Sequence, residues 1–324
     1  MTILVLTLAF LLAANFAIGV WSKRVPFKKQ IDSILKASHP NLVFTGNSMM
    51  AGHVDIDQFN SITTAIGGNL HPVNAALGAS QQPEQWLLFD IAMKSQPDLK
   101  MLVAGFDDTL LTADTTTTPW ALTGNRLVGL DSRIPAKEAL DAYNFTPFEQ
   151  LEFRFLRIAP LIAHRANMWR NVELLRRRMG SMGMQASQGT ELGRVEDFEA
   201  MDKGISTYFE SDIARFSSNP AHFNLSYERI FSKADARHMK VVLLLMPISE
   251  QHRNRYYRRP IWTQYLENLR KLAAARGYEL IDASNWVNGD ENFDDPLHMS
   301  RSGIAIFTAR LAEELNKRME AAVQ

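Results

Sequence analysis

Two short patterns at opposite ends of the chain contain residue types that can perform nucleophilic chemistry. Near the start, the apolar residues 42–45 are followed directly by Gly46-Asn47-Ser48. Gly46 permits a tight turn, and a helix beginning here offers backbone N–H groups and a favourable dipole to an oxyanion beside Ser48. Serine is also a leading N-cap residue, so Ser48 could instead serve only to begin the helix.

The second pattern is Asp295-Pro-Leu-His298, which precedes an amphipathic segment near the C-terminal end. An aspartate three residues before a histidine in a loop can hold the imidazole while its other nitrogen faces a nucleophile. The plainer alternative is an aspartate that caps the last helix and an ordinary surface histidine. Taken together with Ser48, the pattern indicates a nucleophile and the base that would activate it.

Short apolar segments alternate with helical patterns along the chain. The run at residues 240–246 is continuous, as expected for a strand that is buried on both faces. The alternation predicts a parallel sheet with helices on both faces. Strands are expected at 42–45, 72–75, 100–104, 240–246 and 279–282, and helices at 83–94, 227–237, 261–276 and 302–322.

The stretch from about residue 112 to 219 is too long for a simple crossover and has no convincing strand. Residues 148–179 have a helical pattern interrupted at Pro160, and residues 180–193 are typical of a flexible loop. We therefore predict a helical insertion or lid at 112–219. The mixture of apolar residues and arginines at residues 153–179 suits a helix on a membrane surface or against a membrane partner, and equally an amphipathic lid helix.

Composition excludes several classes of protein. The chain has 324 residues, 46% of them hydrophobic, with 35 basic and 35 acidic side chains. This is enough to bury a core, and there is no excess positive charge for nucleic acid. The absence of cysteine excludes disulfides, thiolate metal sites and a cysteine nucleophile. Because the HExxH, Walker A and Gly-x-Gly-x-x-Gly patterns are also missing, we expect no metal or nucleotide cofactor.

Four blocks in a fixed order give the chain a resemblance to a known superfamily. A serine follows the first strand, a glycine the second and an aspartate pair the third, and Asp-x-x-His precedes the last helix. The arrangement resembles the SGNH (GDSL-type) hydrolases and acyltransferases of the membrane-anchored bacterial type, over roughly residues 40–112 and 238–322. It implies a three-layer, flavodoxin-like α/β fold. The blocks are Gly46-Asn47-Ser48, Asn74-Ala-Ala-Leu-Gly78-Ala-Ser80, Gly105-Phe-Asp-Asp108 and Asp295-Pro-Leu-His298.

The resemblance assigns a role to each of these residues. It implies that Ser48 is the nucleophile, that His298 is the general base oriented by Asp295, and that the N–H groups of Ser48 and Gly78 donate to the oxyanion. The superfamily has an asparagine donor where this chain has Asp107. An ionised carboxylate would repel the oxyanion, and losing one donor typically costs about 2.7–4 kcal/mol in the transition state. Asp107 is therefore either protonated, turned away while another donor substitutes, or the mark of a catalytically weak protein.

Residues 3–21 form an uncharged apolar run that is long enough to cross a hydrocarbon core of about 30 Å. We interpret residues 1–22 as an uncleaved membrane anchor, with a cleaved signal peptide or a buried core helix as alternatives. A linker at 23–39 and an SGNH-like domain at 40–324 are expected to follow. Four basic residues come after the run and none precedes it, which would place the domain in the cytoplasm. The implied surface-polymer chemistry instead favours the exocytoplasmic (periplasmic) side, which we predict.

The resemblance implies an acyl-ester hydrolase or O-acyltransferase that acts on a cell-surface glycan or polymer, as in polysaccharide acetylation, beside a membrane-bound O-acyltransferase. The alternative is a weakly active or inactive subunit of the same fold that binds glycan or such a partner, which Asp107 favours. Two weaker features remain. Arg253–Arg259 is a basic run that could contact an anionic glycan or lipid head group, or be a solvated loop. His53 could line the pocket, although an incidental position is the simpler interpretation.

Overall fold

The structure, a computed structural model, describes residues 2–21, 25–114, 117–165, 168–169, 209–218 and 222–321. Five parallel strands form one sheet in the order β2-β1-β3-β4-β5. This confirms the predicted parallel sheet and its flavodoxin-like strand order. The strands are β1 (Leu42–Thr45), β2 (Pro72–Asn74), β3 (Met101–Phe106), β4 (Lys240–Leu245) and β5 (Glu279–Asp282).

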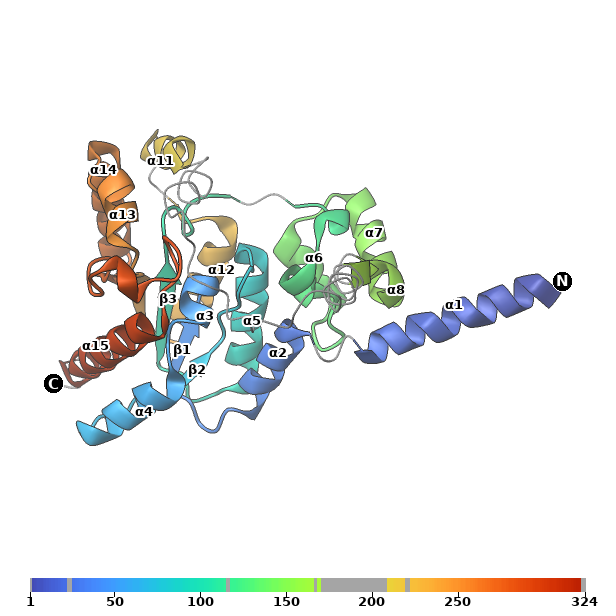
Figure 1. Ribbon diagram of the computed structural model, residues 1–324, viewed down its shortest axis with the longest axis horizontal. Coiled ribbons are helices and arrows are strands. Elements are labelled where there is room, and N and C mark those ends of the chain that lie inside the picture. The colour runs from blue at the N-terminus through green and yellow to red at the C-terminus, as the bar shows by residue number, and fades with distance from the viewer. Residues whose placement is uncertain are drawn as a thin grey trace, which may run out of the picture. The chain divides into compact units, whose positions relative to one another are not determined.

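Helices cover both faces of the sheet (Figure 1). The helices α4 (Ile56–Ala65) and α15 (Arg301–Ala321) pack together on one face, and α5 (Gln82–Ser95) and α12 (Leu225–Asp235) pack together on the other. The helix α14 (Pro260–Ala275) leads into β5 and packs against it. The shorter elements here are α3 (Ser48–Ala51), α11 (Phe209–Ser218), α13 (Glu250–His252), η4 (Arg253–Tyr257) and η5 (Asp290–Asn292).

The two central strands form the most deeply buried part of the sheet. All residues of β3 are buried, and so are all residues of β4 after Lys240. Both strands are apolar on their two faces, because each face is covered by helices. Burying one such Val or Leu side chain contributes about 1.5–3 kcal/mol, so these strands supply a large part of the unit's stability.

The carboxyl ends of β1, β2 and β3 lie side by side. The register places Phe44 beside Asn74 and Thr45 beside Ala104. Gly46 turns the chain out of β1 with a φ of +150°, and a Cβ at this position would lie 2.7 Å from the carbonyl oxygen of Gly105. Any residue other than glycine would push the loop after β1 away from β3. The loops that carry Ser48, Gly78 and Asp107 therefore start from neighbouring points on one edge of the sheet.

The chain leaves the sheet after β3 and returns to it through α12. At this point the Asn224 side-chain amide donates to the Leu110 carbonyl at 2.8 Å, and the Asn224 backbone N–H donates to the Leu111 carbonyl at 2.9 Å. Where they are described, residues 112–219 contain helices and no strand. The loop expected at 180–193 lies outside the described residues, and the role of this insertion as a lid stays a prediction.

The chain forms two compact units. The sheet belongs to the unit made of Ser33–Thr115 and Leu192–Gln324, and the second unit is made of Met1–Asp32 and Thr116–Glu191. The segment 23–39, predicted as a linker, contains α2 (Pro26–Lys36). The second unit contains α1 (Thr2–Trp21), η2 (Pro119–Ala121), η3 (Gly124–Leu130), α6 (Ala136–Tyr143), α7 (Pro147–Ile158) and α8 (Pro160–Ala163).

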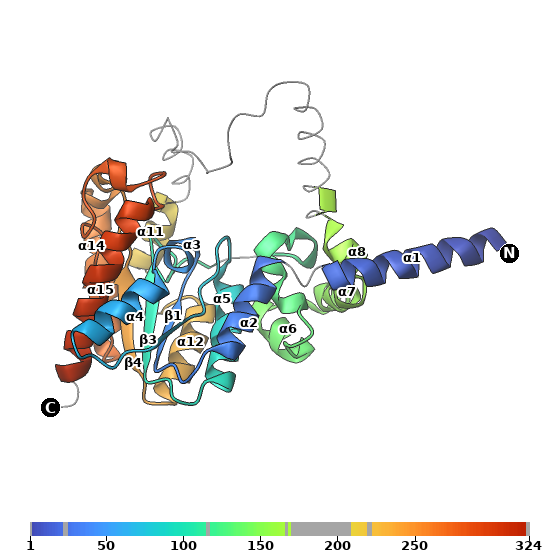
Figure 2. The ribbon, with the colours of Figure 1, turned by 60° about the horizontal axis from the view of Figure 1, so that its bottom comes forward.

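The long N-terminal helix α1 belongs to this second unit (Figure 2). Its segment Ile3–Val20 is long and apolar enough to cross a membrane, and none of it is buried in the part of the chain that the structure describes. In the described residues, α1 packs against α8. A core helix would bury most of its apolar side chains, so burial in the protein core does not account for this segment.

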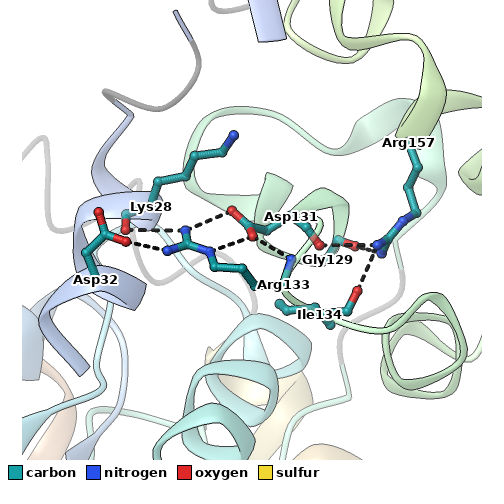
Figure 3. A network of polar contacts seen from close by, with 7 residues as sticks. All are labelled: Lys28, Asp32, Gly129, Asp131, Arg133, Ile134 and Arg157. Atoms are coloured by element: carbon teal, nitrogen blue, oxygen red, sulfur yellow. Dashed lines mark hydrogen bonds and ion pairs between the residues drawn. The ribbon is translucent and has the colours of Figure 1, made fainter. Parts of the chain in front are cut away.

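An aspartate and an arginine link the elements of the second unit (Figure 3). Asp131 accepts hydrogen bonds from Arg133 Nε at 2.8 Å and from Arg133 Nη2 at 3.0 Å, and Arg133 also pairs with Asp32 of α2. Burial acts to raise the pKa of Asp131, but its hydrogen bonds from Arg133 outweigh this and hold the pKa below its usual value. Asp131 is therefore ionised at neutral pH and fixes Arg133 between η3 and α2.

A second arginine, Arg157 of α7, donates to three carbonyl oxygens (Figure 3). These belong to Gly129 at 2.7 Å, Ile134 at 2.7 Å and Asp131 at 3.2 Å, all of which are buried residues. They lie at the end of η3 and just beyond it, where a short helix leaves its last carbonyls without partners. One guanidinium thus satisfies several acceptors at once.

We expect Arg157→Met to destabilise this unit by about 2–3 kcal/mol, because buried acceptors then lose a charged donor. Amide hydrogen exchange across residues 124–134 should become roughly 10²-fold faster. Arg154→Met is the matched control, since Arg154 is exposed on the same helix. Equal exchange rates in the two variants would contradict the assigned role of Arg157.

Candidate active site

Ser48 is the first residue of α3, the single helical turn after β1. The N-cap is the preceding residue, Asn47, whose Oδ1 accepts a hydrogen bond from the Met49 backbone N–H at 2.9 Å. The Ser48 hydroxyl is therefore not needed to cap the helix. Its backbone N–H is one of those that the start of a helix leaves without a partner inside the helix.

His298 lies in a tight loop that precedes α15. Phe293 and Met299 form an antiparallel bridge across this loop, and both side chains are buried in the core. The Asp294 backbone N–H donates to the His298 carbonyl at 2.8 Å. The loop is thus closed on itself and anchored by apolar packing, which fixes the position of the imidazole.

Ser48, His298 and Asp295 form one chain of hydrogen bonds. His298 Nε2 lies 2.9 Å from Ser48 Oγ, and His298 Nδ1 lies 2.8 Å from Asp295 Oδ2. The other oxygen of Asp295 accepts from the backbone N–H groups of Leu297 at 2.9 Å and of His298 at 2.8 Å. Because a carboxylate can only accept, Nδ1 carries the proton, and Nε2 is left to accept from the serine hydroxyl.

The pKa shifts of this pair agree with its geometry. Burial acts to raise the pKa of Asp295, but the hydrogen bonds from His298 and from the backbone outweigh it and lower the pKa below its usual value. The hydrogen bond from Asp295 is the main cause of a raised pKa at His298. A more basic imidazole accepts a proton from serine more readily, so His298 is suited to act as a general base.

Gly78, in the loop after β2, lies next to the serine. A Cβ at Gly78 would be 3.9 Å from Ser48 Cβ. The loop is held to β1 and the turn after it, since the Ala75 N–H donates to the Phe44 carbonyl at 2.8 Å. The backbone of Gly78 therefore passes close to the side chain of Ser48. The role of the Gly78 and Ser48 N–H groups as oxyanion donors stays a prediction.

Asp107 follows β3 and is the buried carboxyl group of the site. Its Oδ1 accepts a hydrogen bond from Asn47 Nδ2 at 2.8 Å. Burial, and then the charge of the neighbouring Asp108, raise its pKa to about 6. Asn47 therefore links the start of α3 to a carboxyl group that changes charge near neutral pH.

Asp108, by contrast, is fixed by two aromatic side chains. Its Oδ1 accepts from the Tyr257 hydroxyl at 3.0 Å and lies 3.1 Å from His252 Nε2, while its own N–H donates to the Tyr257 oxygen at 3.0 Å. Asp108 has a φ of +41°, which is uncommon for a residue other than glycine. These bonds hold the strained turn and so determine the direction in which Asp107 points.

His53 lies closer to the site than an incidental position would. Its ring packs edge-to-face against His298, with 5.4 Å between ring centroids. Burial, and then the nearby His298, lower the pKa of His53 to about 3. His53 is therefore uncharged at neutral pH, and its ring packs against the imidazole of His298.

The contacts of His252 and Tyr257 could not be found from the sequence. Both lie more than 140 positions from Asp108 in the chain, and Tyr257 ends the π-helical turn η4. No local pattern of residues signals such a long-range contact. The only available signal was the aspartate pair itself, since a second carboxylate beside Asp107 needs a partner.

The basic run from Arg253 to Arg259 has a structural use at both of its ends. Arg253 Nη1 donates to the carbonyl oxygens of Ser284 at 2.7 Å and Ile248 at 3.0 Å. Arg259 pairs with Glu210 of α11. These two arginines hold the loops together, and contact of this run with an anionic ligand stays a prediction.

Comparisons with known proteins give a broad likeness of fold. No family model matches the chain, and no curated protein matches it. A lipase/acylhydrolase from Enterococcus faecalis is 12% identical over 86% of this chain and 96% of its own, with a TM-score of 0.38. A GDSL-like lipase from Bacteroides thetaiotaomicron is 11% identical over 90% of this chain and 98% of its own, with a TM-score of 0.38. Likeness at this level does not indicate an activity.

Proposed function

We propose that this protein is a serine-dependent acyl-ester hydrolase or O-acyltransferase of the SGNH type. The observation that carries the proposal is the unbroken chain from Ser48 Oγ to His298 Nε2 at 2.9 Å and from His298 Nδ1 to Asp295 Oδ2 at 2.8 Å. A serine, a histidine and an aspartate in this order are the parts needed for nucleophilic acyl transfer.

In the proposed reaction, Ser48 Oγ attacks the acyl carbonyl carbon while His298 Nε2 takes the hydroxyl proton. The oxyanion forms within reach of the N–H groups of Ser48 and Gly78, and Asp295 stabilises the imidazolium. His298 then gives the proton to the leaving alkoxide, and Ser48 is left as an acyl ester. Water or a sugar hydroxyl next gives its proton to His298 and attacks the ester. The bond to Ser48 Oγ then breaks, His298 returns the proton to this oxygen, and the acid or the new ester is released.

We place this chemistry on a cell-surface glycan or polymer on the outer side of the membrane. Support comes from α1, which is long and apolar enough to serve as an anchor, and from the resemblance of the sequence to anchored SGNH proteins. An enzyme held at the membrane could receive acyl groups from a membrane-bound O-acyltransferase. The basic residues that follow α1 favour the opposite orientation, so protease accessibility in sealed cells is the measurement that decides the side.

One observation favours a second candidate, a binding subunit with little activity. Asp107 stands where the superfamily has an asparagine donor, and its Oδ1 is an acceptor for Asn47. When ionised, Asp107 would oppose the oxyanion instead of stabilising it. A glycan-binding or partner-binding protein would tolerate this residue at no cost.

A fluorophosphonate probe tests the enzyme proposal directly. The probe reacts only with a serine whose proton a base can remove, so purified protein should be labelled at Ser48, and mass spectrometry should place the adduct on that residue. Ser48→Ala should not be labelled. Ser61→Ala, which changes an exposed serine on α4, is the matched control and should label normally. Equal labelling of wild type and Ser48→Ala would reject the mechanism, and no labelling of either would favour the binding subunit.

A further inference from the structure

The helix α7 has two apolar faces, and in the described part of the chain only one of them is buried. Phe153 and Leu156 are buried inside the second unit. The opposite face carries four large apolar side chains, spaced three or four residues apart so that they form one stripe. These are Phe148, Leu151, Phe155 and Ile158, which are 69%, 66%, 43% and 75% exposed. We call these four residues the α7 stripe.

The end of α7 is joined to the membrane-length helix α1 by a polar side chain. Asn15 Nδ2 donates to the Ile158 carbonyl at 3.3 Å, and Asn15 Oδ1 accepts from the Leu161 N–H at 3.0 Å. Pro160 interrupts the helix between these two residues and leaves both groups without their helical partners. The Asn15 carboxamide supplies the missing donor and the missing acceptor together.

This contact lies within the apolar span of α1. Asn15 comes five residues before Val20, where the span ends. At 1.5 Å per residue, the junction of α7 and α8 is about 8 Å inside that end of the span. Amphipathic helices at membrane surfaces bury their apolar faces to a similar depth, about 5–10 Å. Because no water is present at that depth to satisfy a broken helix, pairing by Asn15 is what a lipid environment requires.

Side chains near the junction suit the boundary between lipid and water. Arg165 lies over the half-exposed ring of Trp120, at 5.1 Å from the ring centroid, and donates to the Trp120 carbonyl at 2.8 Å. Tryptophan and arginine are typical of the head-group region, where one end of each side chain is apolar and the other is wet. Arg154 is a further exposed arginine on the same helix as the α7 stripe.

We propose that the α7 stripe is a membrane-contact surface, seated at the head-group and acyl-chain boundary of the phospholipid bilayer that α1 crosses. The inference rests on the proposed anchoring by α1. Lipid is favoured over a protein partner because the stripe ends at a contact that lies within the apolar span of α1. Two helices of the second unit then contact the bilayer: α1 crosses it, and α7 lies in its interface.

The absence of cysteine allows a clean test on the full chain. Single cysteines at Leu151 and Ile158 would carry an environment-sensitive NBD fluorophore, in protein reconstituted into phosphatidylcholine vesicles that contain phosphatidylglycerol. A nitroxide on the lipid acyl chain then quenches any fluorophore that reaches it. Phe10→Cys in α1 is the reference for a lipid-embedded site. Ile66→Cys, an exposed apolar position on the other unit, and Lys137→Cys, an exposed position on α6, are the controls.

The expected result is that the nitroxide lowers emission from positions 151 and 158 at least about twofold, as at position 10, with no change at 66 and 137. Quenching at 10 without quenching at 151 and 158 would overturn the inference while leaving the anchor intact. A blue-shifted but unquenched signal at 151 and 158 would show that a protein surface covers the stripe instead. Absence of quenching at all positions would reject the anchoring and the inference together.

Discussion

Ser48→Ala is expected to lower the turnover of an activated ester such as p-nitrophenyl acetate by about 10⁴- to 10⁶-fold. The hydroxyl is the proposed point of attack, and no other oxygen is hydrogen-bonded to His298 Nε2 in the described residues. Folding should be almost unaffected, with a change in unfolding free energy within about 0.5 kcal/mol, because Asn47 and not Ser48 caps α3.

Substitutions of His298 and Asp295, which are hydrogen-bonded in series with Ser48, should have strongly non-additive effects on turnover. His298→Ala should be nearly as damaging as Ser48→Ala, and the double variant should be hardly worse than either alone. Asp295→Ala should be milder by about two orders of magnitude, since the imidazole can still accept a proton when it is less well oriented. If the loss of turnover in the double variant equals the product of the two single losses, Ser48 and His298 act independently, which would contradict the mechanism.

The reaction type can be read from the same assay. If added glycan leaves the rate of hydrolysis unchanged, the protein is an esterase. If the acyl group appears on the glycan and Ser48 is required, the protein is a transferase. Absence of activity in both wild type and Ser48→Ala would instead favour the binding-subunit alternative.

Asp107→Asn is expected to raise activity at neutral pH, by up to about 10²-fold. The new side chain keeps the oxygen that accepts from Asn47 and gains an amide that donates at every pH. The wild-type carboxyl donates only when it is protonated, which is below its pKa of about 6. His298 must be neutral to act as a base, which requires a pH above its own raised pKa. In the wild type, a protonated Asp107 needs a low pH and a neutral His298 needs a higher one. In Asp107→Asn only the requirement for a neutral His298 remains.

The same substitution should change the pH dependence in a defined direction. Ionised Asp107 helps to raise the pKa of His298, so removing its charge lowers that pKa. The acid limb of the kcat/KM profile should therefore move to lower pH in Asp107→Asn. Asp294→Asn is the matched control, because it removes another carboxylate charge that raises the pKa of His298 without placing a donor at position 107. Loss of activity in a stably folded Asp107→Asn variant would mean that the carboxylate itself is needed, and would reject position 107 as a donor site.

Much of the fold could be predicted because most of its strands coincide with continuous apolar runs in the sequence. The segments 42–45 and 279–282 were predicted with the bounds that the structure has, and the four predicted helices begin and end within two residues of those observed. The strands β1, β3 and β4 are buried almost throughout and β5 follows a clear helix end, so local pattern and burial agree there. The helices beside Pro160 were also predictable, since proline cannot continue a helix.

The site was less predictable where it depends on contacts between distant segments. Asn47 and Ser48 are adjacent, and both are good N-cap residues. Only the extended backbone at Asn47 decides that this residue caps α3. Whether Asp107 is turned to Asn47 depends on a turn that Tyr257 and His252 hold from far along the chain. His53 lies beside His298 because two segments far apart in the sequence pack together. The spacing of residues in the sequence does not predict this contact.

The bonds between Asn224 and the carbonyls of Leu110 and Leu111 have a consequence for how this chain can vary. The segment between these residues departs from the sheet and rejoins it at one point, so its ends are already closed. Lengthening or shortening such a segment changes the entropy of closing it only slowly, roughly with the logarithm of its length. Within this closed segment α11 packs against α14 of the sheet's unit, so the part that belongs to the second unit is the part whose length could change at little cost to the sheet.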